Sequence, residues 1–369
     1  MTDGKQPESM TLDTEFWVDK RVLVTGHTGF KGGWLSMYLH RLGAHVSGVS
    51  LPPDTSPNLF ECAKIESVLD SRIVDIRHRD ALRDTVVEIQ PDIVFHLAAQ
   101  PLVRRSYRDP VETFDTNVMG SINLLEAVRQ SDSVKAVIMV TSDKCYLNRE
   151  WHWGYRENEP LGGHDPYSAS KACTEIATHA WRASFMSAEA EEQHNCSIAT
   201  ARAGNVIGGG DWSDDRLIPD ILRSLEAGDP ITLRNPQSVR PWQHVLEPLR
   251  GYLQLGEKLF DEGDSWAEGW NFGPPDDDAR NVAEIVDLLS AQWPSGGTWQ
   301  QDVGQHPHEA RYLKLDCSKA RERLGWKPVW NLRESLKQIV RWQHAFLDKK
   351  DMFEFSINVI EEYEGARNA

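Results

Sequence analysis

The sequence lacks the features of a membrane protein, a secreted protein or a disulfide-stabilised protein. No apolar run approaches the ~18 residues that can span a bilayer. Residues 1–16 are polar and contain no apolar segment, so a secretory signal is not expected. The five cysteines are widely spaced and form no C-x-x-C pair. This usage predicts a reduced, cytoplasmic compartment and no structural zinc.

Positive charge is scarce as well. The chain carries 40 Lys and Arg against 56 Asp and Glu, a formal net charge of -16. Proteins that bind nucleic acid usually present a basic stripe, so no nucleic-acid partner is expected. A phosphate-bearing small molecule would have to be held by a few local arginines. His306 and His308 lack further ligands at a suitable spacing, so no metal site is expected either.

Short apolar runs alternate with helical patterns as far as about residue 204. The runs expected to be strands are 21–25, 44–49, 71–76, 93–97, 136–140 and 197–201. Continuous apolar strands that alternate with helices are typical of a parallel sheet covered on both faces. The sequence therefore predicts an α/β fold with a Rossmann-type doubly wound parallel sheet.

Beyond Gly204 the alternation weakens, and loops, tryptophans and prolines dominate. This part is expected to form a smaller C-terminal α/β domain over the carboxyl ends of the strands, where ligands bind in open sheets. The predicted dinucleotide-binding domain comprises 17–204 and returning segments around 238–272. The predicted substrate domain comprises 205–237 and 273–350. Residues 1–16 and 351–369 are expected to be a peripheral arm and tail.

Three glycines, Gly26, Gly29 and Gly32, follow the first expected strand. Between a strand and a helix, such glycines permit a tight turn and a close approach of the backbone to a pyrophosphate. The second strand ends at Ser50, with no acidic residue in the usual place for the ribose and no arginine for a 2′-phosphate. This favours NAD over NADP, with Ser50 or Asp54 contacting the ribose. The predicted dinucleotide-binding loop is Gly26, His27, Thr28, Gly29, Phe30, Lys31 and Gly32.

Tyr167 and Lys171 are spaced so that they share one face of a helix. A nearby ammonium, together with the positive nicotinamide ring, is expected to lower the pKa of the tyrosine hydroxyl. Tyr167 can then act as a base on a sugar hydroxyl. Ser142, at the end of the apolar run 136–140, is expected to complete a Ser–Tyr–Lys set.

Several motifs resemble the extended short-chain dehydrogenase/reductase family of NAD-dependent sugar-nucleotide epimerases and dehydratases. The resemblance covers about residues 17–345 and is strongest to the dehydratases that act on CDP-D-glucose. It rests on TGHTGFKG at 25–32, LAAQPLVRRSY at 97–107, TSDKCY at 141–146, EWHWGYRE at 150–157, GGHDPYSASK at 162–171 and VRPWQHVLEPL at 239–249.

The residues after Ser142 set the expected reaction. In related dehydratases an acidic residue in the place of Asp143 protonates the departing 6-hydroxyl, which an epimerase does not need. In dTDP-glucose dehydratases a Glu follows it and takes the C5 proton, whereas this chain has Lys144. Lys144 is therefore expected either to act as a neutral C5 base or to stabilise the enolate while another group takes the proton.

The resemblance also implies further binding residues. Asp75 and Ile76 match the pair that holds the adenine ring, and Asn205 and Arg240 match residues that face the substrate phosphates. Cofactor contacts are also expected at Leu97, Ala98, Ala99, Gln100 and Thr141. Substrate contacts are expected at Arg104, Asn117, Arg202, Asn205, Arg240, Asn271 and Arg311.

The implied activity is that of a cytoplasmic lyase which converts CDP-D-glucose to a 4-keto-6-deoxy sugar nucleotide for deoxysugar synthesis, such as that of lipopolysaccharide O-antigen. A homodimer or homotetramer is expected. A dehydratase for another nucleotide sugar and an epimerase remain alternatives. A non-catalytic NAD-sensing protein of the same fold is a further alternative, although such proteins usually lose the Tyr/Lys pair.

Overall fold

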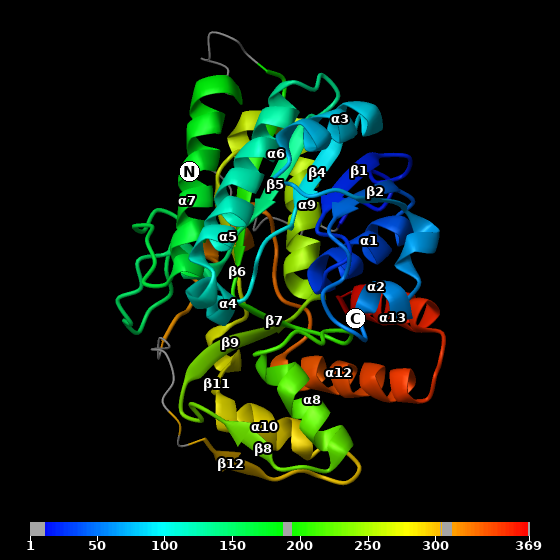
Figure 1. Cartoon of the computed structure of the whole chain (residues 1–369), viewed down its shortest axis with the longest axis vertical. Coiled ribbons are helices and arrows are strands. Elements are labelled where there is room, and N and C mark those ends of the chain that lie inside the picture. The colour runs from blue at the N-terminus through cyan, green and yellow to red at the C-terminus, as the bar shows by residue number, and fades with distance from the viewer. Residues whose placement is uncertain (1–11, 187–193, 303, 305–311, 368–369) are drawn as a thin grey trace, which may run out of the picture.

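The computed structural model describes residues 12–186, 194–302, 304 and 312–367, and its main element is a seven-stranded sheet (Figure 1). The strand order is β10-β6-β5-β4-β1-β2-β3, and every pair of neighbours is parallel. This confirms the predicted Rossmann-type fold. The strands are β1 (Arg21–Thr25), β2 (His45–Ser50), β3 (Asp70–Ile73), β4 (Ile93–His96), β5 (Ala136–Val140), β6 (Ser197–Ala203) and β10 (Gly269–Phe272).

Helices cover both faces of this sheet. Strand β5 shows why: Ile138 packs into the cluster that includes α9, and Val137 packs into the cluster that includes α3 and α6. A strand buried on both faces must be apolar throughout, as the run 136–140 is. The flanking helices are α1 (Phe30–Arg41), α3 (Arg79–Ile89), α6 (Gly120–Arg129), α7 (Pro166–Trp181) and α9 (Leu246–Glu262).

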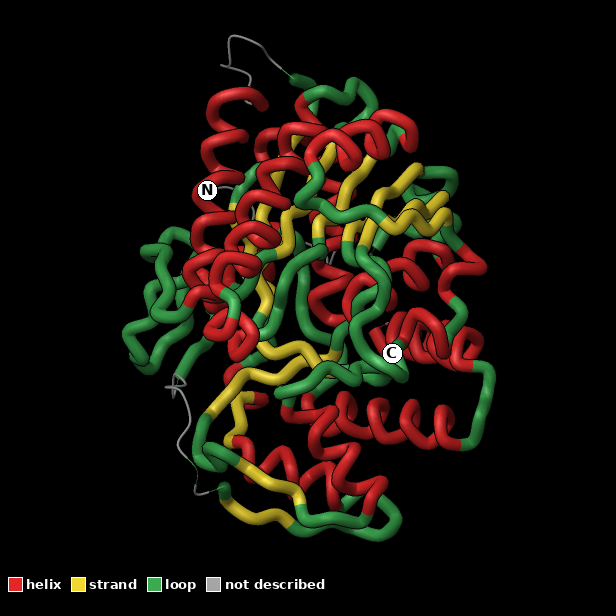
Figure 2. The backbone as a smooth tube through the Cα atoms, viewed as in Figure 1, coloured by secondary structure: helices red, strands yellow, loops and turns green. Residues whose placement is uncertain are grey.

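The second half of the chain forms a smaller lobe below the sheet in Figure 2. Its helices and strands enclose a separate apolar core that includes Ile221, Leu289 and Leu336. One small sheet has the order β11-β9-β7, and β12 pairs with β8. The elements are β7 (Asn205–Ile207), α8 (Leu217–Ala227), β8 (Ile231–Leu233), β9 (Val239–His244), β11 (Ala279–Asn281), α10 (Val282–Ser290), β12 (Trp299–Gln301) and α12 (Leu332–Leu347).

Shorter helices connect these elements. Those near the carboxyl ends of the strands are α4 (Val103–Arg108), α5 (Pro110–Phe114), a π-helical turn (Asp115–Met119) and a 3₁₀ turn (Asp143–Cys145). The others are α2 (Leu59–Cys62), Ile65–Val68, Arg182–Met186, Gly263–Trp266, Asp276–Asp278 and α11 (Ser318–Arg323).

The expected peripheral tail is instead a packed helix, α13 (Met352–Arg367), which contacts α1 and α12. Its buried residues Met352, Ser356, Val359, Ile360 and Tyr363 recur at helical spacing. The Tyr363 hydroxyl donates to Glu247 Oε2 at 2.6 Å, which ties α13 to α9. The prediction of a peripheral tail is therefore wrong for Met352–Arg367.

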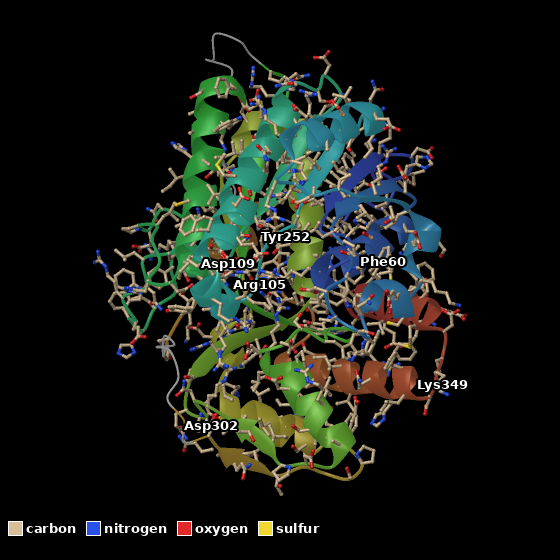
Figure 3. The ribbon with its side chains drawn as sticks, in the orientation of Figure 1. Phe60, Arg105, Asp109, Tyr252, Asp302 and Lys349 are labelled. Atoms are coloured by element: carbon tan, nitrogen blue, oxygen red, sulfur yellow. The ribbon has the colours of Figure 1, made fainter. Side chains whose placement is uncertain are left out.

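Side chains fill the space between sheet and helices (Figure 3). Tyr252 on α9 lies fully buried in the middle of the molecule, whereas Lys349 lies exposed at its edge. Among the described residues, no helix is both long and apolar enough to cross a membrane.

Candidate active site

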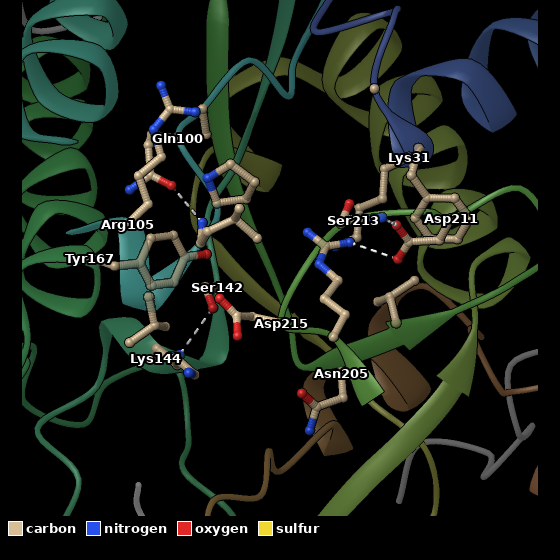
Figure 4. Close-up of a pocket in the computed structure, with 18 of the residues that line it drawn as sticks. Lys31, Gln100, Arg105, Ser142, Lys144, Tyr167, Asn205, Asp211, Ser213 and Asp215 are labelled. Atoms are coloured by element: carbon tan, nitrogen blue, oxygen red, sulfur yellow. Dashed lines mark hydrogen bonds and ion pairs between the residues drawn. The ribbon is translucent and has the colours of Figure 1, made fainter. Parts of the chain in front are cut away.

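A cavity of about 1650 Å³ opens at the carboxyl ends of the parallel strands, between the sheet and the smaller lobe. Its lining comes from the segments that follow β1, β2, β4, β5 and β6, together with α7 and the loop before α8. Open α/β sheets bind ligands at this edge. Figure 4 shows Tyr167, Ser142 and Lys144 on one side of this space, and Lys31, Asp211 and Ser213 on the other.

The glycine loop leaves room for a ligand because its backbone is tightly turned. Gly26 has a φ of +79°, and a Cβ on Gly32 would lie 2.1 Å from the Gly26 carbonyl oxygen. Helix α1 begins within this loop, at Phe30, so that Gly32 lies in its first turn. The exposed N–H groups of a helix N-terminus suit a pyrophosphate, so the loop fits the dinucleotide predicted for it.

The side chain of His27 turns into the protein and does not line the cavity, which leaves its backbone for the predicted cofactor contact. Its Nε2 lies 2.8 Å from Ser71 Oγ, and its ring packs edge-on against Phe60. Burial lowers the pKa of His27 to about 4, so the ring is neutral at physiological pH. The remaining predicted loop residues Gly26, Thr28, Gly29, Phe30, Lys31 and Gly32 all line the cavity.

Ser50 and Asp75, which are expected to contact the ribose and the adenine, also lie on the cavity wall. Their side chains, however, already bond other protein groups. Ser50 Oγ lies 2.7 Å from Thr28 Oγ1. The Asp75 carboxylate receives hydrogen bonds from Arg77, whose guanidinium lowers its pKa. A ribose or adenine group would share these polar atoms with the protein. The other predicted cofactor residues on the wall are Ile76, Leu97, Ala98, Ala99, Gln100 and Thr141.

Tyr167 and Lys171 face the cavity from successive turns of α7. This helix begins at Pro166, and the Asp165 carboxylate caps it by accepting from Ser168 N at 2.9 Å. Lys171 Nζ donates to the Val140 carbonyl at 3.2 Å. Burial lowers the pKa of Lys171 to about 8, against the opposing effect of its carboxylate neighbour Glu175.

The tyrosine hydroxyl is not activated by the protein alone. Burial raises the pKa of Tyr167 to about 12, although the Ser142 hydroxyl and Arg216 oppose this rise. The predicted lowering of this pKa combined Lys171 with a positive nicotinamide ring, so it stays a prediction for the NAD-bound enzyme.

Ser142, Asp143 and Lys144 follow β5 and form a 3₁₀ turn at the edge of the cavity. Ser142 Oγ donates to Asp143 Oδ1 at 3.0 Å and accepts from Lys144 N at 3.2 Å. Burial raises the pKa of Asp143, against the lowering effects of Lys144, Arg240 and Lys31. A carboxyl group with a raised pKa is suited to act as an acid.

Two further cations, Lys31 and Arg216, line the same cavity. Burial, Arg216 and Lys171 together lower the pKa of Lys31 to about 7. Arg216 lies on the cavity wall and is held by Asp211, with Nη1 and Oδ2 2.9 Å apart. Arg216 is not predictable from the sequence, because the surrounding segment DWSDDR resembles a solvated acidic loop and no local spacing links it to Tyr167.

Three predicted substrate residues, Arg104, Asn205 and Arg240, line the cavity. Arg104 Nη1 pairs with Asp215 Oδ1 at 3.0 Å across its mouth. Arg311, like His306 and His308, lies outside the described residues.

The other three predicted substrate residues hold the protein together and do not line the cavity. Asn117 bonds the Gln100 backbone and Ser170 Oγ, with Gln100 N to Asn117 Oδ1 at 2.8 Å. Arg202 forms a buried ion pair with Glu175 at 2.7 Å. Asn271 accepts from the Tyr146 hydroxyl at 2.8 Å. Their buried polar atoms already have protein partners, which favours a structural role for all three, as the sequence had also allowed for Asn117.

A Rossmann-type sheet with a glycine loop facing a Tyr–Lys helix defines the class of short-chain dehydrogenases/reductases. A model of the NAD dependent epimerase/dehydratase family matches residues 22–266, and the chain belongs to this family. This membership confirms the predicted family and the predicted cofactor, NAD.

Individual relatives support a finer grouping within this family. The chain is 54% identical over 355 residues to CDP-glucose 4,6-dehydratase of Salmonella typhimurium, which covers 96% of this chain and 99% of the relative. It is 28% identical to a dTDP-glucose 4,6-dehydratase of Xanthomonas campestris pv. campestris, over 87% of this chain and 92% of the relative.

Solved structures share the fold. The structure of MoeE5 in complex with UDP-glucose and NAD has a TM-score of 0.73 and 25% identity, covering 88% of this chain and 99% of that one. UDP-glucose 4-epimerase of Thermotoga maritima has a TM-score of 0.75 at 23% identity, covering 88% of this chain and 99% of that one.

Gly32→Ala tests the glycine loop. Because the added Cβ would lie 2.1 Å from the Gly26 carbonyl oxygen, the loop must shift, and we expect NAD affinity to fall at least about tenfold. Calorimetric titration with NAD measures this loss. Gly365→Ala is the matched control, since a Cβ there meets nothing within 4 Å. Wild-type affinity in Gly32→Ala would place the pyrophosphate elsewhere.

Proposed function

We propose that this chain is a lyase that converts CDP-D-glucose to CDP-4-dehydro-6-deoxy-D-glucose and water. The observation that carries the proposal is Asp143, a buried acid next to Ser142 on the cavity wall that also holds Tyr167. An epimerase needs no acid for a departing hydroxyl. The 54% identity to a CDP-glucose 4,6-dehydratase supports the choice of nucleotide.

When bound, NAD supplies the hydride acceptor for C4 of the glucose and the hydride donor for C6. Tyr167 takes the proton of the C4 hydroxyl, and Lys171 and Ser142 hold its phenol oxygen in place. The resulting C4 ketone acidifies the C5 hydrogen. Asp143 then protonates the 6-hydroxyl as it leaves as water, a role that its raised pKa favours.

Arginines on the cavity wall are proposed to hold the substrate diphosphate. Arg240 acts on the charge of Asp143, and Arg216 acts on the charge of Tyr167, so both lie near the reacting groups. A planar guanidinium can bind phosphate oxygens through two hydrogen bonds at once. Asn205 and Arg104 line the same cavity and are assigned to the substrate as well.

A homodimer is proposed on one exposed apolar surface. Val111 and Phe114 on α5, Met119 on the π turn and Ile176 on α7 are all exposed, and these elements pack against one another. Contiguous exposed apolar side chains are typical of protein interfaces, and a second copy offers the same surface. Sedimentation analysis measures this oligomeric state.

A cytoplasmic location is proposed from the reduced cysteines and the small-molecule substrate.

The decisive experiment is incubation of the purified enzyme and NAD with CDP-, dTDP- and GDP-sugars. We expect the alkali-induced absorbance of a 4-keto-6-deoxy product with CDP-D-glucose. Tyr167→Phe, which lacks the base but keeps the ring, should lower turnover by ~10²–10⁴. Product from dTDP-glucose alone would assign another nucleotide, and a C4 epimer without dehydration would assign an epimerase.

Asp143→Asn separates elimination from oxidation. The amide cannot supply an acidic proton, but Tyr167 remains in place, so C4 oxidation should still occur. Rapid mixing with CDP-D-glucose should therefore show reduced-nicotinamide absorbance that rises and persists. The serine on the same turn provides a control, because Ser142→Ala should slow oxidation itself. If the Asp143→Asn variant never reduces NAD, Asp143 acts in the oxidation step and not in the elimination.

Lys144, in its neutral form, is proposed as the base that takes the C5 proton. Its half-buried side chain lines the cavity directly after Asp143. In deuterated water, Lys144→Met should lose exchange at C5 while NAD reduction continues, and Lys144→Glu should partly restore exchange. If Lys144→Met still exchanges the C5 hydrogen at the wild-type rate, Lys144 is not the base and has only an electrostatic role.

A further inference from the structure

Glu175 is a buried carboxylate one turn beyond Lys171 on α7, with its side chain 3% exposed. Its Oε1 accepts from Thr141 Oγ1 at 2.5 Å and from Arg202 Nε at 2.8 Å. Its Oε2 accepts from Thr200 Oγ1 at 2.7 Å and from Arg202 Nη2 at 2.7 Å. Burial opposes the ionised form, but Arg202 and the two hydroxyls outweigh it and lower the pKa of Glu175. The carboxylate is therefore charged at physiological pH.

These contacts join two successive turns of α7 to two successive residues at the end of β5. Lys171 Nζ donates to the Val140 carbonyl, and Glu175 accepts from the Thr141 hydroxyl. Ser142 and Asp143 follow immediately in the chain. The placement of the tyrosine and lysine relative to the serine and aspartate therefore depends on these contacts.

Arg202 extends this attachment to the other end of the 3₁₀ turn. Its Nη1 donates to the Tyr146 hydroxyl at 2.6 Å, and Tyr146 follows that turn directly. One ion pair thus holds α7, the end of β5 and the segment 143–146 in a single arrangement.

Glu175 is also the anion that faces the Lys171 ammonium. Burial lowers the pKa of Lys171, and Glu175 exerts the largest opposing effect, ahead of Cys145 on the 3₁₀ turn. Burial raises the pKa of Cys145 well above its usual value, so the thiol is neutral. His96 on β4 is neutral too, with its pKa lowered to about 3. Lys31 on α1 adds only positive charge.

We propose that Glu175 is a positioning residue of this active site. Together with Arg202 it fixes the Tyr167–Lys171 helix against the Ser142–Asp143 segment, and its negative charge stabilises the Lys171 ammonium. The catalytic part of this proposal rests on the proposed function, but the charge relation between Glu175 and Lys171 does not.

The test is Glu175→Gln, which keeps the shape and removes the charge. Lys171 lines the cavity, so a small acylating reagent such as acetic anhydride can reach it, and only the neutral amine reacts. Mass spectrometry of the peptide that contains Lys171, over a pH series, gives the midpoint of its titration. We expect this midpoint to fall by at least about one pH unit in the variant. The turnover number should fall about tenfold or more, while KM changes little. The alkaline limb of its pH profile should shift to lower pH by the same amount as the Lys171 midpoint.

Glu175→Asp should restore most of the midpoint because it keeps the charge. Glu247→Gln is the control for loss of a buried carboxyl group: Glu247 is held by Tyr363 and the Val329 and Trp330 backbone, away from the cavity, and burial raises its pKa to about 7. If Glu175→Gln does not fold, the double variant with Arg202→Met leaves no unpaired buried charge and should show the same shift. An unchanged midpoint in a folded variant would overturn the proposal. If the wild-type enzyme does not convert CDP-D-glucose, the proposed function is wrong. The labelling experiment still tests the charge relation between Glu175 and Lys171.

Discussion

The attachment of α7 to the end of β5 is the constraint on which the rest of the site depends. Tyr167 and Lys171 come from a helix, whereas Ser142 and Asp143 come from the turn after a strand. The bonds from Lys171 to Val140 and from Thr141 to Glu175 supply that constraint within the buried interior, where hydrogen bonds to charged groups are strongest.

A second consequence concerns charge. The protein carries a net charge of -16, yet its cavity gathers Lys31, Lys144, Lys171, Arg216 and Arg240. Burial weakens the protonated forms of Lys31 and Lys171, and Arg216 and Lys171 add to the effect on Lys31, so that the two pKa values fall to about 7 and 8. Anionic ligands stabilise such cations. The same wall also carries acidic side chains, among them Asp143, Asp211 and Asp215, so the diphosphates of NAD and of the sugar nucleotide would be held by individual cations and not by a positive charge over the whole cavity.

Much of this fold was predictable because its signals are local. The strand β5 is apolar throughout, and the glycine triplet and the Tyr167/Lys171 spacing each lie within one short segment. The errors have a common origin: a motif shows which residue is present but not where its side chain points. His27 and Arg202 are both predicted to contact ligands, yet both side chains are buried among protein partners. Arg216 reaches the site only because a distant loop folds over it, which no local spacing reveals.

The pKa of Tyr167 connects these points. In the protein alone burial raises it to about 12, so the phenol is protonated and cannot accept a proton at physiological pH. Ser142 and Arg216 already oppose the rise, which leaves bound ligands as the remaining source of a lower value. The oxidised nicotinamide ring carries positive charge, and a positive charge beside a phenol favours its ionised form. Bound oxidised cofactor would therefore favour the ionised phenol, and this effect would be lost once the ring is reduced. With the role proposed for Tyr167, the sugar hydroxyl would then be deprotonated only when a hydride acceptor stands beside it.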